Sequence, residues 1–330
     1  MLIGKFKTNH PFLFILLFVI SILLWLDSFM GYESITVDYE NYAPFYTILV
    51  GFVNEYRFLS VLLSFLIMLA QAFMFNRVIA NKNLVDRNSF LPALLFIVLM
   101  SSNPEFAGLH PVWLANFFLI ITLDKIFDVF REDDVFLEVF NVGLFISLAS
   151  LFYMPALGFI LLIISALIIY FLVNMRGIMA SVIGFVFPYI FLMLYYYWFD
   201  KPLNNLWSLF YFEGFSVLQG NWRLTTYDWI MLSVMGLVGL VAFFRIYLGG
   251  LRDKPIRIRK RFQVLLAYLL IALVSWLMAG DMVSLHLGVV LLPLAAILAG
   301  FFQESKSRFW NEMLFSIILV MIIAGKLSLL

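Results

Sequence analysis

The sequence contains no cysteine, and it has few charged residues for its length. Without cysteine the chain can form no disulfide, thiolate metal site, iron–sulfur cluster or cysteine nucleophile. Charged residues make up only 12% of the 330 residues, whereas a soluble domain carries about a quarter. Motifs of soluble enzymes are also missing, because the chain has no P-loop, G-x-S-x-G, H-E-x-x-H or G-x-G-x-x-G sequence. The net charge of +1 gives no reason to expect a nucleic acid as a partner.

Apolar residues are abundant instead, and they occur in long runs. They make up 64% of the chain, which has 38 phenylalanines and a mean hydropathy of +1.03. A helix needs about 20 apolar residues to cross a bilayer, so we predict an all-α fold, a polytopic transmembrane helical bundle of about eleven spans. Residues 1–330 are expected to form a single integral membrane domain. The predicted spans are 11–29, 58–76, 89–102, 111–130, 136–152, 155–173, 178–199, 228–247, 262–279, 284–301 and 310–328.

The apolar run from Val135 to Val173 is too long for a single span. Pro155 interrupts it within the sequence SLFYMPALG, and a proline cannot continue a helix without losing a backbone hydrogen bond. We therefore expect a tight hairpin at this proline, with one span on each side of it.

Charge placement sets the expected orientation in the membrane. With eleven spans and the N-terminus inside, the outer side keeps only four of the 21 Lys and Arg residues, as the positive-inside rule requires. Lys5 and Lys7 precede the first apolar run and no small-x-small cleavage site follows it, so we expect a retained first helix. The chain is therefore predicted to be a multi-pass membrane protein, with its N-terminus inside and its C-terminus outside. The four outer bases are Arg57, Lys201, Arg223 and Lys326.

Two of the predicted outer loops are long, residues 31–58 and 200–227. Each holds an apolar run too short to span, APFYTILVGFV in the first and LWSLFYFEGFSVL in the second. Such runs predict an interfacial helix in each loop. Because half of the 20 Asp and Glu residues also fall on the outer side, this side is acidic and is where we expect a functional site.

Asp38 and Glu40 in the first outer loop are the candidate catalytic residues. They are two positions apart, so in a strand or extended loop both would face the same side. A carboxylate there could act as a general base toward a sugar hydroxyl or hold a divalent metal ion. The alternative is a solvated acidic loop without chemistry.

Glu105 and His110 are the candidate metal ligands, in the short outer turn SNPEFAGLHPVW. A glutamate and a histidine could share a divalent metal ion with Asp38, although their spacing matches no established metal motif. Pro111 opens the next helix in either case, since proline is common at the first helical position.

Three further residues are candidates for substrate binding. Arg223, an outer base, could hold the phosphate of a lipid, or it could pair with Glu213 or Asp228. Asp281 lies at an outer turn, and His286 lies one turn inside a span, where an ionisable group is costly and usually faces a polar interior. A structural hydrogen bond is the alternative for His286. The polar residues expected to form interhelical hydrogen bonds are Gln71, Asn76, Asn116 and Asn141.

Four stretches together carry a family resemblance: GLHPVWLANFFLIITLDKIFD, FNVGLFISLASLFYMPALGFIL, VIGFVFPYIF and LLPLAAILAGFF. They resemble an uncharacterised family of polytopic inner-membrane proteins of Bacteroidota over roughly residues 75–330. This resemblance implies that the chain is a multi-pass protein of a bacterial inner (cytoplasmic) membrane, but it implies no mechanism. The architecture also looks like that of the membrane glycosyltransferases of the GT-C superfamily, whose first long outer loop carries a functional acid. In that resemblance Asp38 or Glu40 takes the place of the acid, but the chain is shorter than most such enzymes and lacks a clear Asp-x-Asp pair.

Three function hypotheses follow. The first is a GT-C-like transferase that uses a polyprenyl-phosphate-linked sugar, or a related lipid-linked donor, at the outer face. The second is a non-catalytic membrane subunit with protein partners in an envelope biosynthesis or secretion complex. The third is a transporter of a lipid or small solute, with a polar path between the helices that His286, Asp281, Asn116 and Asn141 would line. Membrane lipids are expected partners in all three.

Overall fold

A computed structural model of the protein shows helices, and no strand, in the residues that it describes. This confirms the predicted all-α class for that part of the chain. The described residues are 2–8, 10, 12–31, 43, 45–46, 53, 56–130, 135–200, 224–246, 249, 254–279, 282–305 and 307–328. The interfacial helices predicted within 31–58 and 200–227 therefore lie almost entirely outside the described residues.

The helices coincide with the apolar runs of the sequence, and each predicted span falls on a helix. In the described part of the chain, eight helices are long and apolar enough to cross a membrane, as expected for a multi-pass membrane protein. The α-helices are α1 (Leu2–Phe6), α2 (Phe12–Met30), α4 (Arg57–Asn81), α5 (Leu91–Met100), α6 (Pro111–Val129), α7 (Val135–Phe152), α8 (Ile160–Tyr170), α9 (Met175–Trp198), α11 (Thr226–Arg245), α12 (Ile256–Ser275), α13 (Val283–Glu304) and α14 (Arg308–Ser328). Three 3-10 helices, η1 (Pro104–Ala107), η2 (Met154–Phe159) and η5 (Trp276–Met278), join some of them.

The helix break predicted at Pro155 is confirmed, while the segment that follows it, Met154–Tyr170, is shorter than the eight helices long enough to cross a membrane. Helix α7 ends at Phe152, and Pro155 lies in the first turn of η2, which leads into α8. The 3-10 segment suits this position because proline has no N–H to donate at the start of a helix. At its other end α8 stops at Phe171, which takes a left-handed conformation with φ of 58° and so reverses the chain toward α9.

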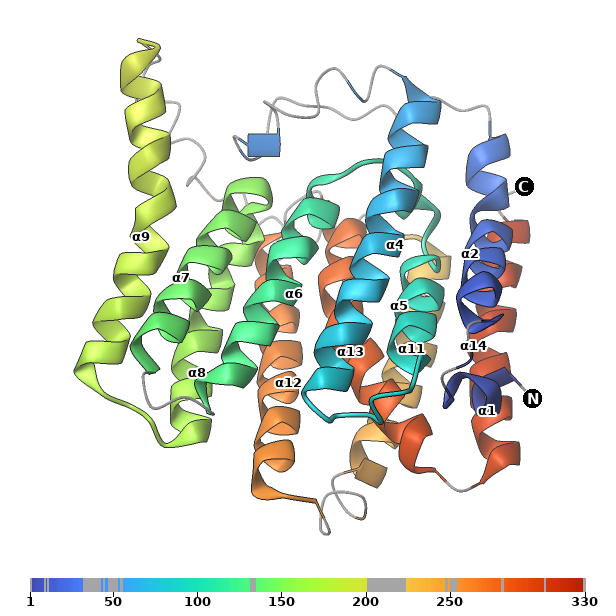
Figure 1. Ribbon diagram of the computed structural model, residues 1–330. Coiled ribbons are helices and arrows are strands. Elements are labelled where there is room, and N and C mark those ends of the chain that lie inside the picture. The colour runs from blue at the N-terminus through green and yellow to red at the C-terminus, as the bar shows by residue number, and fades with distance from the viewer. Residues whose placement is uncertain are drawn as a thin grey trace.

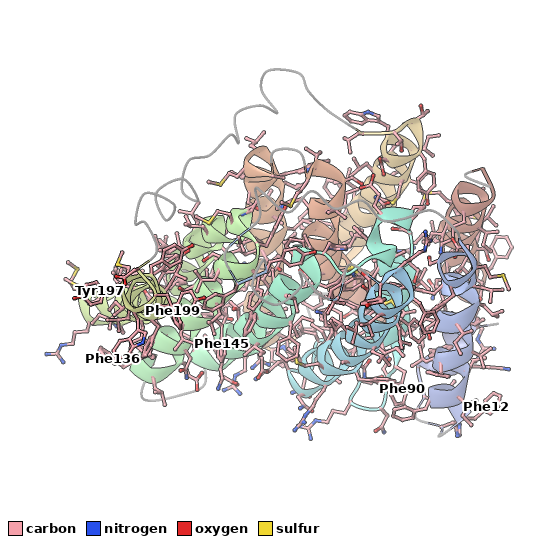
Figure 2. The ribbon with its side chains drawn as sticks, turned by 90° about the horizontal axis from the view of Figure 1, so that it is seen from above. Phe12, Phe90, Phe136, Phe145, Tyr197 and Phe199 are labelled. Atoms are coloured by element: carbon pink, nitrogen blue, oxygen red, sulfur yellow. The ribbon has the colours of Figure 1, made fainter. Side chains whose placement is uncertain are left out.

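The helices form two rows, and α5 lies between them, packed against α13 of the second row. Helices α9, α7, α6, α4 and α2 make one row, and α8, α12, α13, α11 and α14 make the other (Figures 1 and 2). Every residue of α5 is buried, and 94% of the most apolar stretch of α13 is buried. These two helices therefore form the interior of the bundle, and the helices around them shield it.

The outer surface of the bundle is apolar. Only 28% of the apolar stretch is buried in α2, α11 and α14. Aromatic side chains stand away from the ribbon at its edges, among them Phe12 with 62% and Tyr197 with 78% of its surface exposed (Figure 2). Such a surface would be aggregation-prone in water and is typical of a protein surrounded by lipid.

Helix α9 stands at one edge of the bundle and depends on α7 for its packing (Figure 1). Two glycines allow the two backbones to touch. A Cβ atom on Gly143 would lie 2.2 Å from the backbone oxygen of Ser181, and one on Gly184 would lie 2.2 Å from that of Phe140. Small residues at such a crossing let membrane helices approach closely without a hydrophobic driving force.

Helices α4 and α6 end, and α12 begins, at the lower end of the bundle in Figure 1, and charged side chains from these segments make contacts there. The Lys82 ammonium lies 2.8 Å from the Asp124 carboxylate and 2.7 Å from that of Asp128. The Arg261 guanidinium donates to the backbone oxygens of Lys82 and Phe127. These contacts tie α4, α6 and α12 together.

Three of the four polar residues that were predicted to form hydrogen bonds between helices do form them. Gln71 donates to the backbone oxygen of Trp113, and Asn116 donates to that of Gly288 at 3.0 Å. The side-chain oxygen of Asn76 accepts the backbone N–H of Ala93 at 3.2 Å. Each of these bonds replaces a hydrogen bond to water that the side-chain amide loses when the helices pack around it.

Candidate functional site

The upper end of the bundle holds a polar cluster built from three separate segments. We call Asn103, Glu105, Asp228 and Ser284 the Glu105 cluster. Asn103 precedes η1, Asp228 lies in the first turn of α11, and Ser284 lies in the first turn of α13. Three helix starts with unpaired N–H groups therefore meet here, and that end of a helix favours negative charge.

Asn103 is the centre of this cluster. Its side-chain oxygen accepts the backbone N–H of Glu105 at 2.9 Å, which caps η1. Its amide nitrogen donates to the Ser284 hydroxyl at 2.7 Å and to the Asp228 carboxylate at 3.2 Å. One buried amide thus fixes the relative positions of η1, α11 and α13.

Asp228 is buried, with 2% of its surface exposed, and belongs to a capping box. Its carboxylate accepts the backbone N–H and the hydroxyl of Thr225, at 2.9 and 2.8 Å, while the Thr225 oxygen accepts the Asp228 N–H at 3.2 Å. With the Asn103 bond added, both carboxylate oxygens are occupied. Its primary role is to start α11 and to fix it to η1.

Glu105 has the chemically available carboxyl group of the cluster, because its side chain is exposed. Partial burial raises the pKa of this carboxyl group above its usual range, and the nearby charge of Asp228 raises it further. A hydrogen bond with Ser284 opposes these effects. Since Ser284 accepts from Asn103, its proton is directed toward Glu105. A surface carboxylate with a raised pKa is a suitable general base.

His110 lies beside this cluster but in a different environment. Its ring packs 5.6 Å from that of Phe106 and 5.5 Å from that of Trp113, and 4% of its surface is exposed. Neither ring nitrogen has a hydrogen-bond partner within the described chain. Burial lowers the pKa of His110 to about 3, so the ring is neutral at physiological pH.

The burial of His110 predicts that acid weakens the fold. In the unfolded chain its pKa returns to near 6.5, so between pH 6.5 and about 3 the unfolded state binds more protons than the folded state. The free energy of unfolding then falls as the pH falls through this window, by about 2 kcal/mol at pH 5. Thermal unfolding of the purified chain in detergent from pH 7.5 to 5 should show this loss, and His110→Phe should reduce it. Equal pH dependence in both proteins would contradict it.

His286 is fully buried and connects three elements. Its Nε2 lies 2.9 Å from the backbone oxygen of Ala272 in α12, so this nitrogen carries the proton. Its Nδ1 therefore accepts the hydroxyl of Tyr153, at 2.7 Å, from the segment between α7 and η2. Both ring nitrogens are used by protein groups, and the contact acts as a brace between helices. This is the structural alternative to substrate binding.

The other predicted site residues divide into two groups. The predicted metal site of Glu105 and His110 also includes Asp38, which lies outside the described residues, so this site stays a prediction. Within the described residues no group of three His, Asp or Glu side chains could hold a metal ion. Asp38, Glu40, Arg223 and Asp281 lie outside the described residues. The roles predicted for these four therefore stay predictions.

Sequence reasoning missed Asn103 and Ser284 as site residues, and it considered Asp228 only as a partner for Arg223. A local signal existed for Asp228, because Thr225 with an acid three positions later is a capping box. Asn103 directly before a Pro-Glu pair also fits a cap. Neither signal says that the two caps share a hydrogen bond.

Comparison with known proteins gives a family but no activity. No curated protein and no solved structure matches the chain. A family model does match, over residues 42–327, and its description states that the function of the family is unknown. This range includes the Glu105 cluster, His110, His286, the helices from α4 to α13 and all of α14 except its last residue. The chain therefore belongs to the family of unknown function DUF6427.

Proposed function

We propose that the protein is a GT-C-like transferase acting at the outer face of a bacterial inner membrane, with a polyprenyl-phosphate-linked sugar or a related lipid-linked donor. This proposal includes the predicted eleven spans and an inside N-terminus, which place the upper end of the bundle outside. The proposal also draws on the resemblances of the sequence to Bacteroidota membrane proteins and to GT-C enzymes. The observation that carries it is the exposed carboxyl group of Glu105, with a raised pKa, at that end.

The reaction needs a base and a way to hold the donor. A carboxylate takes the proton of the acceptor hydroxyl, the acceptor oxygen forms a bond to the sugar carbon, and the bond to the phosphate breaks, which releases the polyprenyl phosphate. Glu105 is a candidate for this base beside Asp38 and Glu40. Arg223 is predicted to hold the phosphate of the donor, Asp281 is predicted to take part in substrate binding, and a divalent metal ion is the proposed cofactor.

The position of the Glu105 cluster supports this role. Both long predicted outer loops attach at the same end, since α4 begins there at Arg57 and α11 begins there at Thr226 (Figure 1). A base for a lipid-linked donor has to lie near the membrane surface, because the donor phosphate stays at the headgroup level while its tail stays in the bilayer. Glu105 lies between helices α5 and α6, outside both.

We expect Glu105→Gln to reduce transfer by at least about a hundredfold, because amide groups cannot accept the acceptor proton. In a strain whose own gene is deleted, complementation with each variant should be compared by mass spectrometry of surface glycans at equal protein level. Asp38→Asn and Glu40→Gln test the other two candidates in the same way. Asp200→Asn is the control, because Asp200 is an exposed acid at the same end and asparagine tolerates its φ of 47°.

The outcome of this experiment can contradict the proposal in two ways. An unchanged glycan profile in the deletion strain would remove the transferase function. A changed profile that all three acid variants restore as well as the wild type would remove a carboxylate base. Activity of the wild type should also fall as the pH falls through the raised pKa of Glu105, because only the ionised form accepts a proton.

A non-catalytic subunit of an envelope complex is the second candidate. Its support is that His110 and His286, two of the groups predicted to act chemically, are buried. Chemical crosslinking in native membranes followed by purification would then recover a stoichiometric envelope protein. A transporter has less support, since the side chains of His286 and Asn116, which were expected to line a path, bind protein groups.

A further inference from the structure

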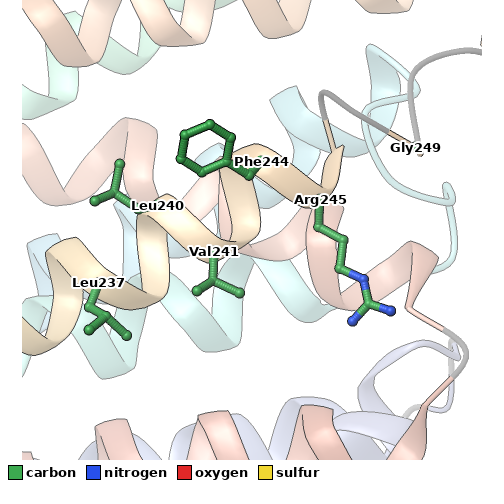
Figure 3. A pocket seen from close by; sticks show the side chains of 6 residues that line it. All are labelled: Leu237, Leu240, Val241, Phe244, Arg245 and Gly249. Atoms are coloured by element: carbon green, nitrogen blue, oxygen red, sulfur yellow. The ribbon is translucent and has the colours of Figure 1, made fainter.

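Helix α11 has an apolar stripe on its outer face that ends in an arginine. Leu237 has 62% of its surface exposed, Leu240 has 58% and Phe244 has 54%. With Val241, these side chains follow the spacing of a single helix face. They line a shallow depression of about 610 Å³ together with Arg245 and Gly249 (Figure 3). The opposite face of α11 is buried against α13 and α14, so the stripe faces away from the bundle.

Arg245 is exposed at the lower end of this stripe, where α11 ends. Figure 3 shows its side chain on the same side of the helix as those of Leu237 and Val241. Within the described chain its guanidinium has no hydrogen bond or ion pair, whereas that of Arg261 donates to two backbone oxygens. All five N–H donors of Arg245 are therefore available, in a planar arrangement that matches phosphate oxygens.

We propose that this depression binds one anionic phospholipid, with its phosphate on Arg245 and one acyl chain along Leu237, Leu240, Val241 and Phe244. The stripe from Leu237 to Phe244 is about 10 Å long, since each helical residue advances about 1.5 Å. That length is about two thirds of the thickness of one leaflet, since the hydrocarbon core is about 30 Å thick in total. The cation lies at the end of the helix, where the headgroup region begins, so charge and apolar surface have the order that a phospholipid requires.

The charge of Arg245 favours an anionic lipid over a zwitterionic one. A phosphatidylcholine headgroup carries its own cation, which competes with the guanidinium for the phosphate. A phosphatidylglycerol headgroup has no such cation. An arginine at the C-terminal end of a helix is also favoured by the helix dipole and would anchor α11 at the interface without any bound lipid. Retention of a specific lipid separates the two roles.

The test uses native mass spectrometry of the full chain in detergent, after addition of phosphatidylglycerol or phosphatidylcholine. We expect each wild-type chain to retain one more phosphatidylglycerol molecule than each Arg245→Gln chain. The apparent affinity of the wild type for phosphatidylglycerol should be roughly tenfold higher than that of the variant. Retention of phosphatidylcholine should be equal in the two proteins. Arg176→Gln is the matched control, because Arg176 is an exposed arginine at the same end that does not line the depression.

A second variant separates the groove from the charge. Val241→Trp fills the depression and leaves Arg245 in place, so it should also lose the retained lipid. Equal phosphatidylglycerol retention in wild type and Arg245→Gln would overturn the proposal, as would an equal loss in Arg176→Gln. Wild-type protein that retains no phosphatidylglycerol would also overturn it, and so would a dimer that Val241→Trp dissociates, because a second copy of the chain would then cover the stripe.

Discussion

Gly184→Leu is expected to separate α9 from α7 and to lower the free energy of unfolding by about 3 kcal/mol or more. An ideal Cβ atom on Gly184 would lie 2.2 Å from the backbone oxygen of Phe140, 3.0 Å from its carbonyl carbon and 3.2 Å from the backbone nitrogen of Leu144. All three are backbone atoms, so no rotamer change can relieve the overlap. Helix α9 would have to move outward, and it would lose its contacts along much of its length.

The control for this prediction is Gly236→Leu. Gly236 is also a glycine within an apolar helix, but a Cβ atom there would have nothing within 4 Å. Thermal unfolding of the purified proteins in the same detergent should therefore show a large loss for Gly184→Leu and little change for Gly236→Leu. Gly143→Ala tests the other half of the crossing, since its Cβ atom would meet the backbone of Ser181. Equal midpoints for Gly184→Leu and Gly236→Leu would rule out a tight crossing.

The positions of the helices could be predicted from the sequence because apolar runs and prolines act locally. Pro155 divides one long apolar run into α7 and α8. The proline can be seen in the sequence, and its missing N–H explains why the helix breaks there. The pairing of α7 with α9 could not be predicted in this way. Gly143 and Gly184 lie in different helices, and neither is part of a G-x-x-x-G motif that would mark a crossing.

The candidate site was predictable only in part, for a similar reason. Glu105 was identified as an acid in an outer turn, which is a local property. Its relation to Asp228 and Ser284 depends on Asn103, whose partners are 125 and 181 positions away. His286 was identified because an ionisable group within a span is costly. Its hydrogen-bond partner Tyr153, which gives His286 a structural role, is 133 positions away. No motif around Tyr153 indicates this contact.

Lys82→Met is expected to destabilise the lower end of the bundle by about 3 kcal/mol, because it leaves two carboxylates without their cation. Lys82 has 8% of its surface exposed, and its ammonium lies within 2.8 Å of both Asp124 and Asp128. The two aspartates are four positions apart on α6, so their side chains lie on one helix face and repel each other once the lysine is gone.

A double-mutant cycle measures this coupling directly. In a protein that already carries Asp124→Asn and Asp128→Asn, Lys82→Met should cost much less, since there is no carboxylate charge to leave unpaired. Arg77→Met is the control, because Arg77 is an exposed base one turn earlier on α4. Its unfolding midpoint should stay close to that of the wild type. If Lys82→Met costs as much in the double-asparagine background as in the wild type, the lysine acts through packing of its alkyl chain and not through its charge.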